Sequence, residues 1–133
     1  MRFVRLASTL IASVMLAGTS LADEALPSTA KKASLEEFKT FADGKKVEVV
    51  IYDLGVPVTA TLTWNWKNKL ITGTALVNGK DKIKVSSKLS FKDDMACATN
   101  QGKATCHAIY IEADKFYEVR ADGKVHAVSA LAK

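Results

Sequence analysis

The stretch Val58-Thr-Ala-Thr-Leu-Thr-Trp-Asn-Trp66 places an apolar side chain at every second position, with Thr or Asn between them. Such unbroken alternation is typical of a β-strand that buries one face. If Lys67 and Asn68 form a two-residue turn, each inward residue of the returning strand lies opposite an inward residue. The predicted pairs are Trp64 with Ile71, Leu62 with Gly73, Ala60 with Ala75, and Val58 with Val77. In this hairpin Gly73 is expected to leave room for Leu62.

Similar β-rich segments run along the rest of the chain, separated by short turns. They cover residues 47–54, 83–91, 95–99, 105–112, 116–120 and 125–131. No second helical pattern is long enough to connect parallel strands. The sequence therefore predicts a mainly β fold, an antiparallel up-and-down meander of about eight strands that forms a small barrel or a curved sheet.

One short helix is expected before the strands. Ser34 and Glu37 have the spacing of a capping box, in which each side chain accepts a hydrogen bond from a backbone N–H at the start of the helix. Leu35, Phe38 and Phe41 follow at helical spacing and form an apolar stripe. We expect this stripe to pack on the sheet.

The N-terminus has the pattern of an export signal. Arg2 and Arg5 precede an apolar run of 13 residues, and Ser20-Leu21-Ala22 offers small residues where a signal peptidase cleaves. As a helix this run would span only about 20 Å, too short for a membrane core of about 30 Å. We therefore predict a signal peptide at residues 1–22, a flexible leader at 23–33 and a single β-barrel-like domain at 34–133. The mature chain, periplasmic or secreted, would have no transmembrane segment.

The two cysteines are predicted to form a disulfide. If Gln101 and Gly102 are the centre of a turn, Cys97 and Cys106 lie directly opposite each other on a hairpin. An exported location is oxidising and agrees with such a bond. The spacing fits neither a redox nor a haem-attachment motif, and zinc would need ligands that the chain hardly has.

Few residues suggest catalysis or metal binding. No phosphate-binding loop, hydrolase motif or metalloprotease motif occurs. His107 and His126, the two histidines, are expected on one face but roughly 10 Å apart, too far for a single ion. We therefore expect no enzyme, no cofactor and no metal, although a haem or metal site that uses one histidine with Tyr117 is left open.

The lysines form a basic row on one strand. The formal net charge of the whole chain is +5, a small surplus, and no aromatic residues alternate with these lysines, so a nucleic-acid partner is disfavoured. The row is either a solvated face that discourages edge pairing or a docking surface for anionic lipopolysaccharide or phospholipid headgroups. Its members are Lys80, Lys82, Lys84, Lys88 and Lys92.

Two tryptophans stand at consecutive inward positions of the first hairpin. They fill the core or line an apolar cavity for a small hydrophobic ligand, and Trp66, next to the turn, is expected at the mouth of the barrel. The candidate ligand-binding residues are Leu62, Trp64, Trp66 and Ile71.

A late segment of the chain, Met95 to Ala127, resembles small exported bacterial lipocalin-like proteins, whose families are mostly of unknown function. The resemblance rests on the pattern C-H-x-I-Y followed by Y-E-V-x-x-D-G-K, in residues Cys97, Cys106, His107, Tyr110, Tyr117 and Gly123. Trp64 has no glycine two residues before it, so the chain departs from the G-x-W opening of true lipocalins. The resemblance implies the fold and the exported location, and it assigns no catalytic or binding residue.

These patterns together predict an exported, non-enzymatic binding protein for a small apolar or amphiphilic ligand. The alternative is an envelope protein-interaction module, such as an inhibitor or a stress or virulence accessory protein, that uses its loops or its lysine-rich face.

Overall fold

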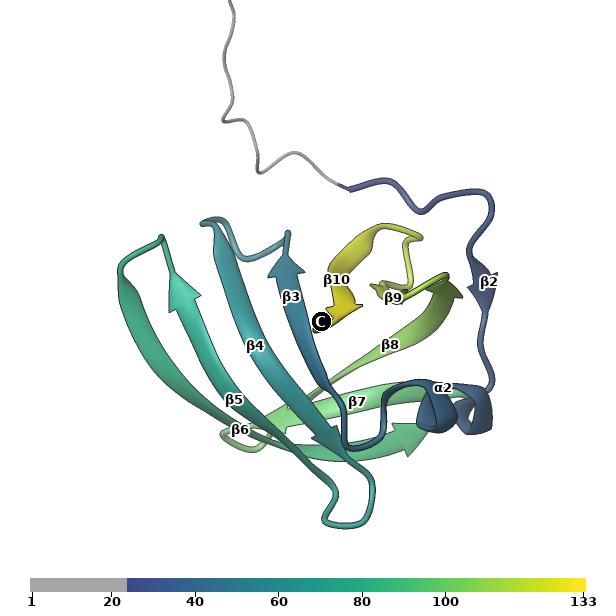
Figure 1. The fold of residues 1–133 in the computed structure, drawn as a ribbon, viewed down its shortest axis with the longest axis horizontal. Helices are drawn as coiled ribbons and strands as arrows, with labels where there is room; N and C mark the ends of the chain where they lie inside the picture. The colour runs from purple at the N-terminus through teal and green to yellow at the C-terminus, as the bar shows by residue number, and fades with distance from the viewer. Residues whose placement is uncertain (1–23) are drawn as a thin grey trace, which may run out of the picture.

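A computed structural model describes residues 24–133, so the predicted signal peptide lies outside the described residues. Eight antiparallel strands follow one another around a barrel, which closes where the last strand pairs with the first (Figure 1). This confirms the predicted mainly β meander and shows that it closes, which removes exposed sheet edges. The strands are β3 (Lys46–Ile51), β4 (Val58–Asn65), β5 (Leu70–Val77), β6 (Asp81–Lys92), β7 (Met95–Asn100), β8 (Lys103–Glu112), β9 (Lys115–Val119) and β10 (Val125–Leu131).

The β4–β5 hairpin has the predicted register. Trp64 pairs with Ile71, Leu62 with Gly73, Ala60 with Ala75 and Val58 with Val77. The role of Gly73 differs from the expectation, because a Cβ there would lie 2.0 Å from the backbone oxygen of Thr61 rather than against the Leu62 side chain. With a φ of +154°, Gly73 adopts a backbone conformation that other residues rarely take.

The helix α2 (Leu35–Ala42) closes one end of the barrel (Figure 1). Its capping box between Ser34 and Glu37 is present as predicted. Phe38 is fully buried, and its ring makes edge-to-face contacts with Trp64, Trp66 and Phe116 at centroid distances of 5.1, 5.1 and 4.8 Å. No helix within residues 24–133 is long and apolar enough to cross a membrane.

The described part of the expected leader lies along the outside of the barrel. Strand β2 (Lys31–Lys32) pairs with β8, and Thr29 donates a hydrogen bond to the Glu112 carboxylate. Leu26 and Ala30 pack on an outer apolar cluster that is centred on Tyr117. This arrangement differs from the expected flexible leader, because these two apolar residues lose contact with water when they cover the cluster.

Cys97 and Cys106 form the predicted disulfide. They face each other across the β7–β8 hairpin, with their Cα atoms 4.0 Å apart. The bond therefore joins two neighbouring strands of the barrel wall.

Candidate ligand-binding site

The barrel contains a cavity of about 570 Å³, which is in the range of small-molecule sites. It extends to the end of the barrel away from α2, where Leu54 and Ile83 are about half exposed. Much of its wall is apolar and comes from β3, β4, β5 and β6. The apolar lining includes Val49, Val58, Leu62, Trp64, Ile71 and Val85.

The four predicted ligand-binding residues separate into two groups. Leu62, Trp64 and Ile71 line the cavity. Trp66 does not, because it lies at the end that α2 closes, where its ring stacks on Phe91 at 5.7 Å between centroids. Trp66 is only 7% exposed, so it belongs to the aromatic core beneath α2 and does not lie at the open mouth of the barrel.

A cluster of polar side chains lies in the part of the barrel wall that β8, β9 and β10 form. We define it as His107 of β8, Glu118 of β9 and His126 of β10, of which Glu118 and His126 line the cavity. The two imidazole rings are stacked, with centroids 4.2 Å apart and planes within 6° of parallel. The predicted separation of roughly 10 Å is therefore wrong.

The prediction used the spacing of strands in a flat sheet, whereas side chains that point into a small barrel converge across the intervening strand β9. A β-bulge also lies at His126. The register between β9 and β10 shifts between Val125 and Ala127, which leaves His126 as an extra residue without a partner on β9. Val125 and Val128 both pack in the outer cluster although they are three residues apart. Strict alternation cannot put two such residues on one face, so this spacing was the available signal for the bulge.

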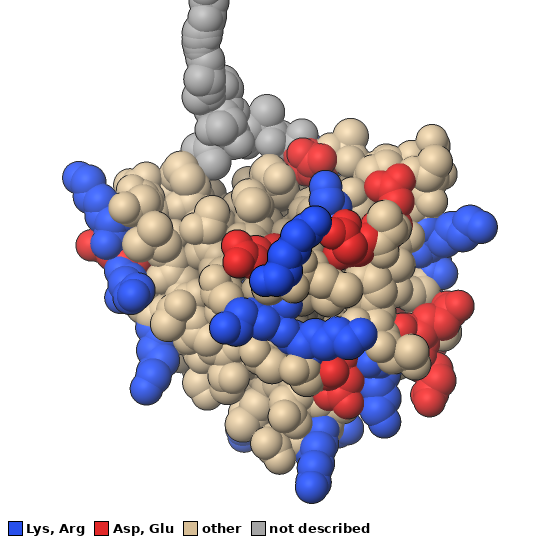
Figure 2. Space-filling view, viewed as in Figure 1, with Lys and Arg blue, Asp and Glu red and all other residues tan. Residues whose placement is uncertain are grey.

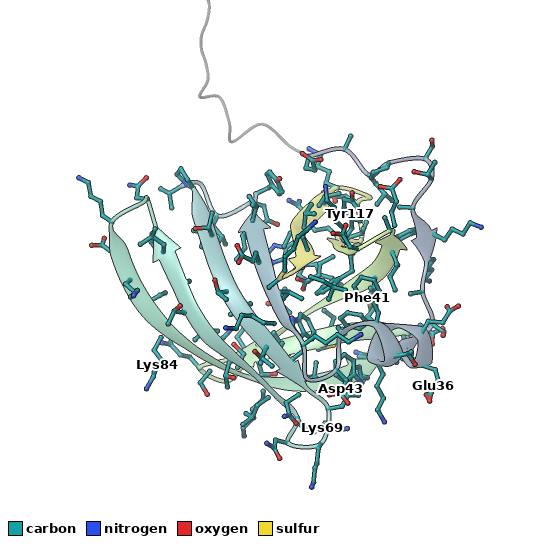
Figure 3. All side chains as sticks on the ribbon, viewed as in Figure 1. Glu36, Phe41, Asp43, Lys69, Lys84 and Tyr117 are labelled. Carbon is teal, nitrogen blue, oxygen red and sulfur yellow. A yellow bond between two sulfur atoms is a disulfide. The ribbon has the colours of Figure 1, made fainter. Side chains whose placement is uncertain are left out.

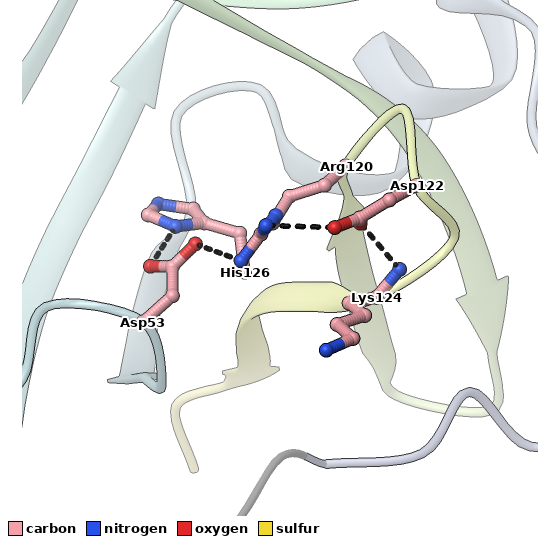
Figure 4. Close-up of polar contacts among 5 residues, drawn as sticks. All are labelled: Asp53, Arg120, Asp122, Lys124 and His126. Atoms are coloured by element: carbon pink, nitrogen blue, oxygen red, sulfur yellow. Dashed lines mark hydrogen bonds and ion pairs between the residues drawn. The ribbon is translucent and has the colours of Figure 1, made fainter.

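A charged network holds the His126 ring from the rim of the barrel (Figure 4). Asp53, which follows β3, lies with its Oδ1 2.6 Å from His126 Nδ1. Arg120 Nη1 lies 3.5 Å from the other Asp53 oxygen, and its Nη2 donates to Asp122 at 2.7 Å. Asp122 also accepts the backbone N–H of Lys124. Asp53, Glu118 and Arg120 were not singled out in the sequence, because no local motif joins them.

Burial is the main cause of the shifted pKa values of His107 and Glu118. The pKa of His107 is lowered to about 4, mainly by burial and further by the positive charge of His126. His107 is therefore neutral at pH 7. Burial raises the pKa of Glu118, with a smaller opposing effect from His126. The closest contact between the two is 3.7 Å, from His107 Nδ1 to Glu118 Oε2, which is longer than a hydrogen bond.

Tyr117 lies apart from the histidines. It is on the outer face of β9, in the cluster covered by Leu26 (Figure 3). Its hydroxyl donates to Glu112 at 3.5 Å, and burial followed by the Glu112 charge raises its pKa. The structure therefore does not bring Tyr117 and either histidine into one site.

The lysine row is exposed along β6 and its flanking turn. Figure 2 shows lysines gathered at the left edge of the view, and Figure 3 places Lys84 there, pointing outward from β6. On the neighbouring outer face, a depression of about 450 Å³ is lined by Val50, Leu76 and Lys82. All five lysines, Lys80, Lys82, Lys84, Lys88 and Lys92, are exposed.

Comparison of the chain with protein-family models, curated proteins and solved structures finds no match. The class that the fold and the site define is an eight-stranded antiparallel barrel with a cavity whose lining is mostly apolar and includes several polar side chains.

Proposed function

We propose that this chain is an exported, non-enzymatic binding protein that holds a small amphiphilic molecule inside its barrel. The observation that carries the proposal is the cavity of about 570 Å³, whose lining is mostly apolar and also includes Glu118 and His126 of the polar cluster. Binding sites for small molecules commonly combine a mostly apolar lining with a few convergent polar groups. The apolar part of the ligand would contact Leu62, Trp64 and Ile71.

The polar cluster favours a ligand whose head donates hydrogen bonds. Glu118 lines the cavity, and its carboxyl oxygens accept no hydrogen bond from any residue within 24–133. An amine or hydroxyl head would supply the donors that a buried carboxyl group requires.

Export is supported by two separate features. The sequence of residues 1–22 has the pattern of a signal peptide, and the Cys97–Cys106 disulfide is typical of proteins in oxidising compartments. A periplasmic or secreted carrier or sensor is the role that fits both features and the cavity.

A matched pair of variants tests the binding site. Ala75 lines the cavity, whereas its neighbour Thr74 is exposed on the outer face of the same strand. Ala75→Phe should fill part of the cavity, and Thr74→Phe should leave it unchanged. The probe is N-phenyl-1-naphthylamine, an apolar amine whose fluorescence rises in apolar surroundings.

The wild-type protein and Thr74→Phe should bind one probe per chain, with at least about ten-fold weaker binding in Ala75→Phe, equivalent to about 1.4 kcal/mol. Decylamine and decanol should displace the probe at lower concentrations than decanoate. Equal binding by the two variants would place the probe outside the barrel and contradict the proposal.

A second candidate is docking of the outer face of β3–β6 on an anionic envelope surface. It is favoured by the exposed Val50 and Leu76, which flank Lys82 around the outer depression. Changing Lys82 and Lys88 to Glu should then weaken binding to phosphatidylglycerol vesicles and leave uptake of the naphthylamine probe unchanged. If vesicle binding does not change, the lysine row is a solvated face.

A further inference from the structure

We propose that His107, Glu118 and His126 form a binding site for a divalent transition-metal ion of the zinc type. One ligand atom from each of the three residues can be chosen so that all of them lie within 4.8 Å of one another. The proposal stands on this convergence and does not depend on whether the cavity holds an amphiphile.

The donor set suits such an ion. Two imidazole nitrogens and one carboxylate oxygen are ligands that Zn²⁺, Co²⁺ and Ni²⁺ accept, and three protein ligands with a remaining free position is a common arrangement for zinc. Because Glu118 and His126 line the cavity, the fourth position would face the cavity. A water molecule or the head of a bound molecule could occupy that position.

Asp53 supplies the supporting contact that metal-binding histidines usually have. Its Oδ1 lies 2.6 Å from His126 Nδ1, which leaves Nε2 of that ring as the ligand atom. A carboxylate on the far nitrogen fixes the tautomer and the ring orientation of a metal-bound histidine. Arg120, at 3.5 Å, in turn holds the Asp53 carboxylate (Figure 4).

Ion binding would require one ring to turn. A metal ion lies close to the plane of each imidazole that ligates it, whereas the two rings are now within 6° of parallel. His126 is held by Asp53, but the nearest acidic oxygen to His107 is 3.7 Å away, which is too long for a hydrogen bond. We therefore expect His107 to rotate out of the stack when the ion binds.

The test is a titration of the chelator-stripped, untagged protein with Zn²⁺ in a calorimeter, repeated with Co²⁺ and read by visible absorption. One ion should bind per chain, with the absorption spectrum of low-coordinate Co²⁺. His107→Ala, His126→Ala and the isosteric Glu118→Gln should each weaken binding at least about ten-fold, and Asp53→Asn about ten-fold or more. Glu112→Gln, which changes a carboxylate outside the cluster, should bind as the wild type does.

NMR of the imidazole nitrogens provides a second readout. Added Zn²⁺ should shift Nε2 of His126 and change the ring environment of His107. Circular dichroism identifies any variant that fails to fold. If an alanine variant is unfolded, zinc binding is compared in Glu118→Gln and Asp53→Asn, which preserve the shape of the side chain. The proposal is overturned if the wild type binds no Zn²⁺, or if folded variants of the three residues bind it as tightly as Glu112→Gln does.

Discussion

The imidazole rings of His107 and His126 lie face to face, 4.2 Å apart, although they come from strands that are not neighbours in the barrel. Strand β9 runs between them and contributes Glu118 to the same cluster. The bulge in β10 lies at His126, and the three residues set a polar, titratable cluster into the barrel wall. Both proposals for this chain depend on that cluster.

The stability of the protein should fall as the pH is lowered from about 6.5 towards 4. The pKa of His107 is about 4 in the folded protein, against 6.5 for an unperturbed histidine, so in this range the unfolded chain takes up a proton that the folded chain does not. The contribution of neutral His107 to the free energy of unfolding is therefore complete above pH 6.5, and it is lost as the pH falls from 6.5 towards the folded-state pKa of about 4. Urea unfolding between pH 7 and pH 4 measures it.

His107→Gln serves as the comparison for this pH dependence. Glu118, whose pKa is raised, acts in the opposite direction in both proteins, so the difference between them isolates His107. The variant should lose less stability than the wild type over the same pH range. Parallel curves for the two proteins would show that His107 does not titrate as described.

Gly73→Ala should destabilise the barrel by about 3 kcal/mol or more, because the new Cβ would lie 2.0 Å from the Thr61 backbone oxygen and the backbone at this position is unfavourable for alanine. The urea midpoint of the variant measures this loss. Gly79→Ala is the control, since its Cβ would meet nothing within 4 Å while its φ is also positive. Similar losses for both variants would mean that the close approach of β4 to β5 is unimportant.

Phe38→Ala should cost about 3–5 kcal/mol, because Phe38 is fully buried and its ring contacts Trp64, Trp66 and Phe116. The exposed neighbour Thr40, changed to Ala, should alter stability by no more than about 0.5 kcal/mol. Thermal unfolding followed by tryptophan fluorescence compares the two variants. A small effect of Phe38→Ala would show that α2 does not seal the barrel.

Replacing Cys97 and Cys106 together by serine should reduce stability by about 2–3 kcal/mol, because the bond closes a short loop in the unfolded chain. Urea unfolding of the double variant and of the oxidised wild type provides the comparison. If the two proteins unfold at the same urea concentration, the bond contributes nothing to the stability of the barrel.

Local pattern was enough to predict the strands, the β4–β5 register, the capping box and the disulfide. Each of these depends on residues that are close in the sequence, so alternation and turn position determine them. Trp66 was misplaced because α2, which covers it, packs there through tertiary contacts that no local pattern displays. The polar cluster was missed because the distance between the histidines was estimated from standard strand spacing, whereas side chains that point into a small closed barrel converge across the intervening strand.

The most direct test of the central claim is the native mass of the protein purified without denaturation from its own host. The wild type and Thr74→Phe should each carry one small molecule that survives gentle ionisation and leaves on denaturation, whereas Ala75→Phe should be bare. A bare wild-type chain, or a molecule retained equally by Ala75→Phe, would contradict the proposal that the barrel cavity is a binding site.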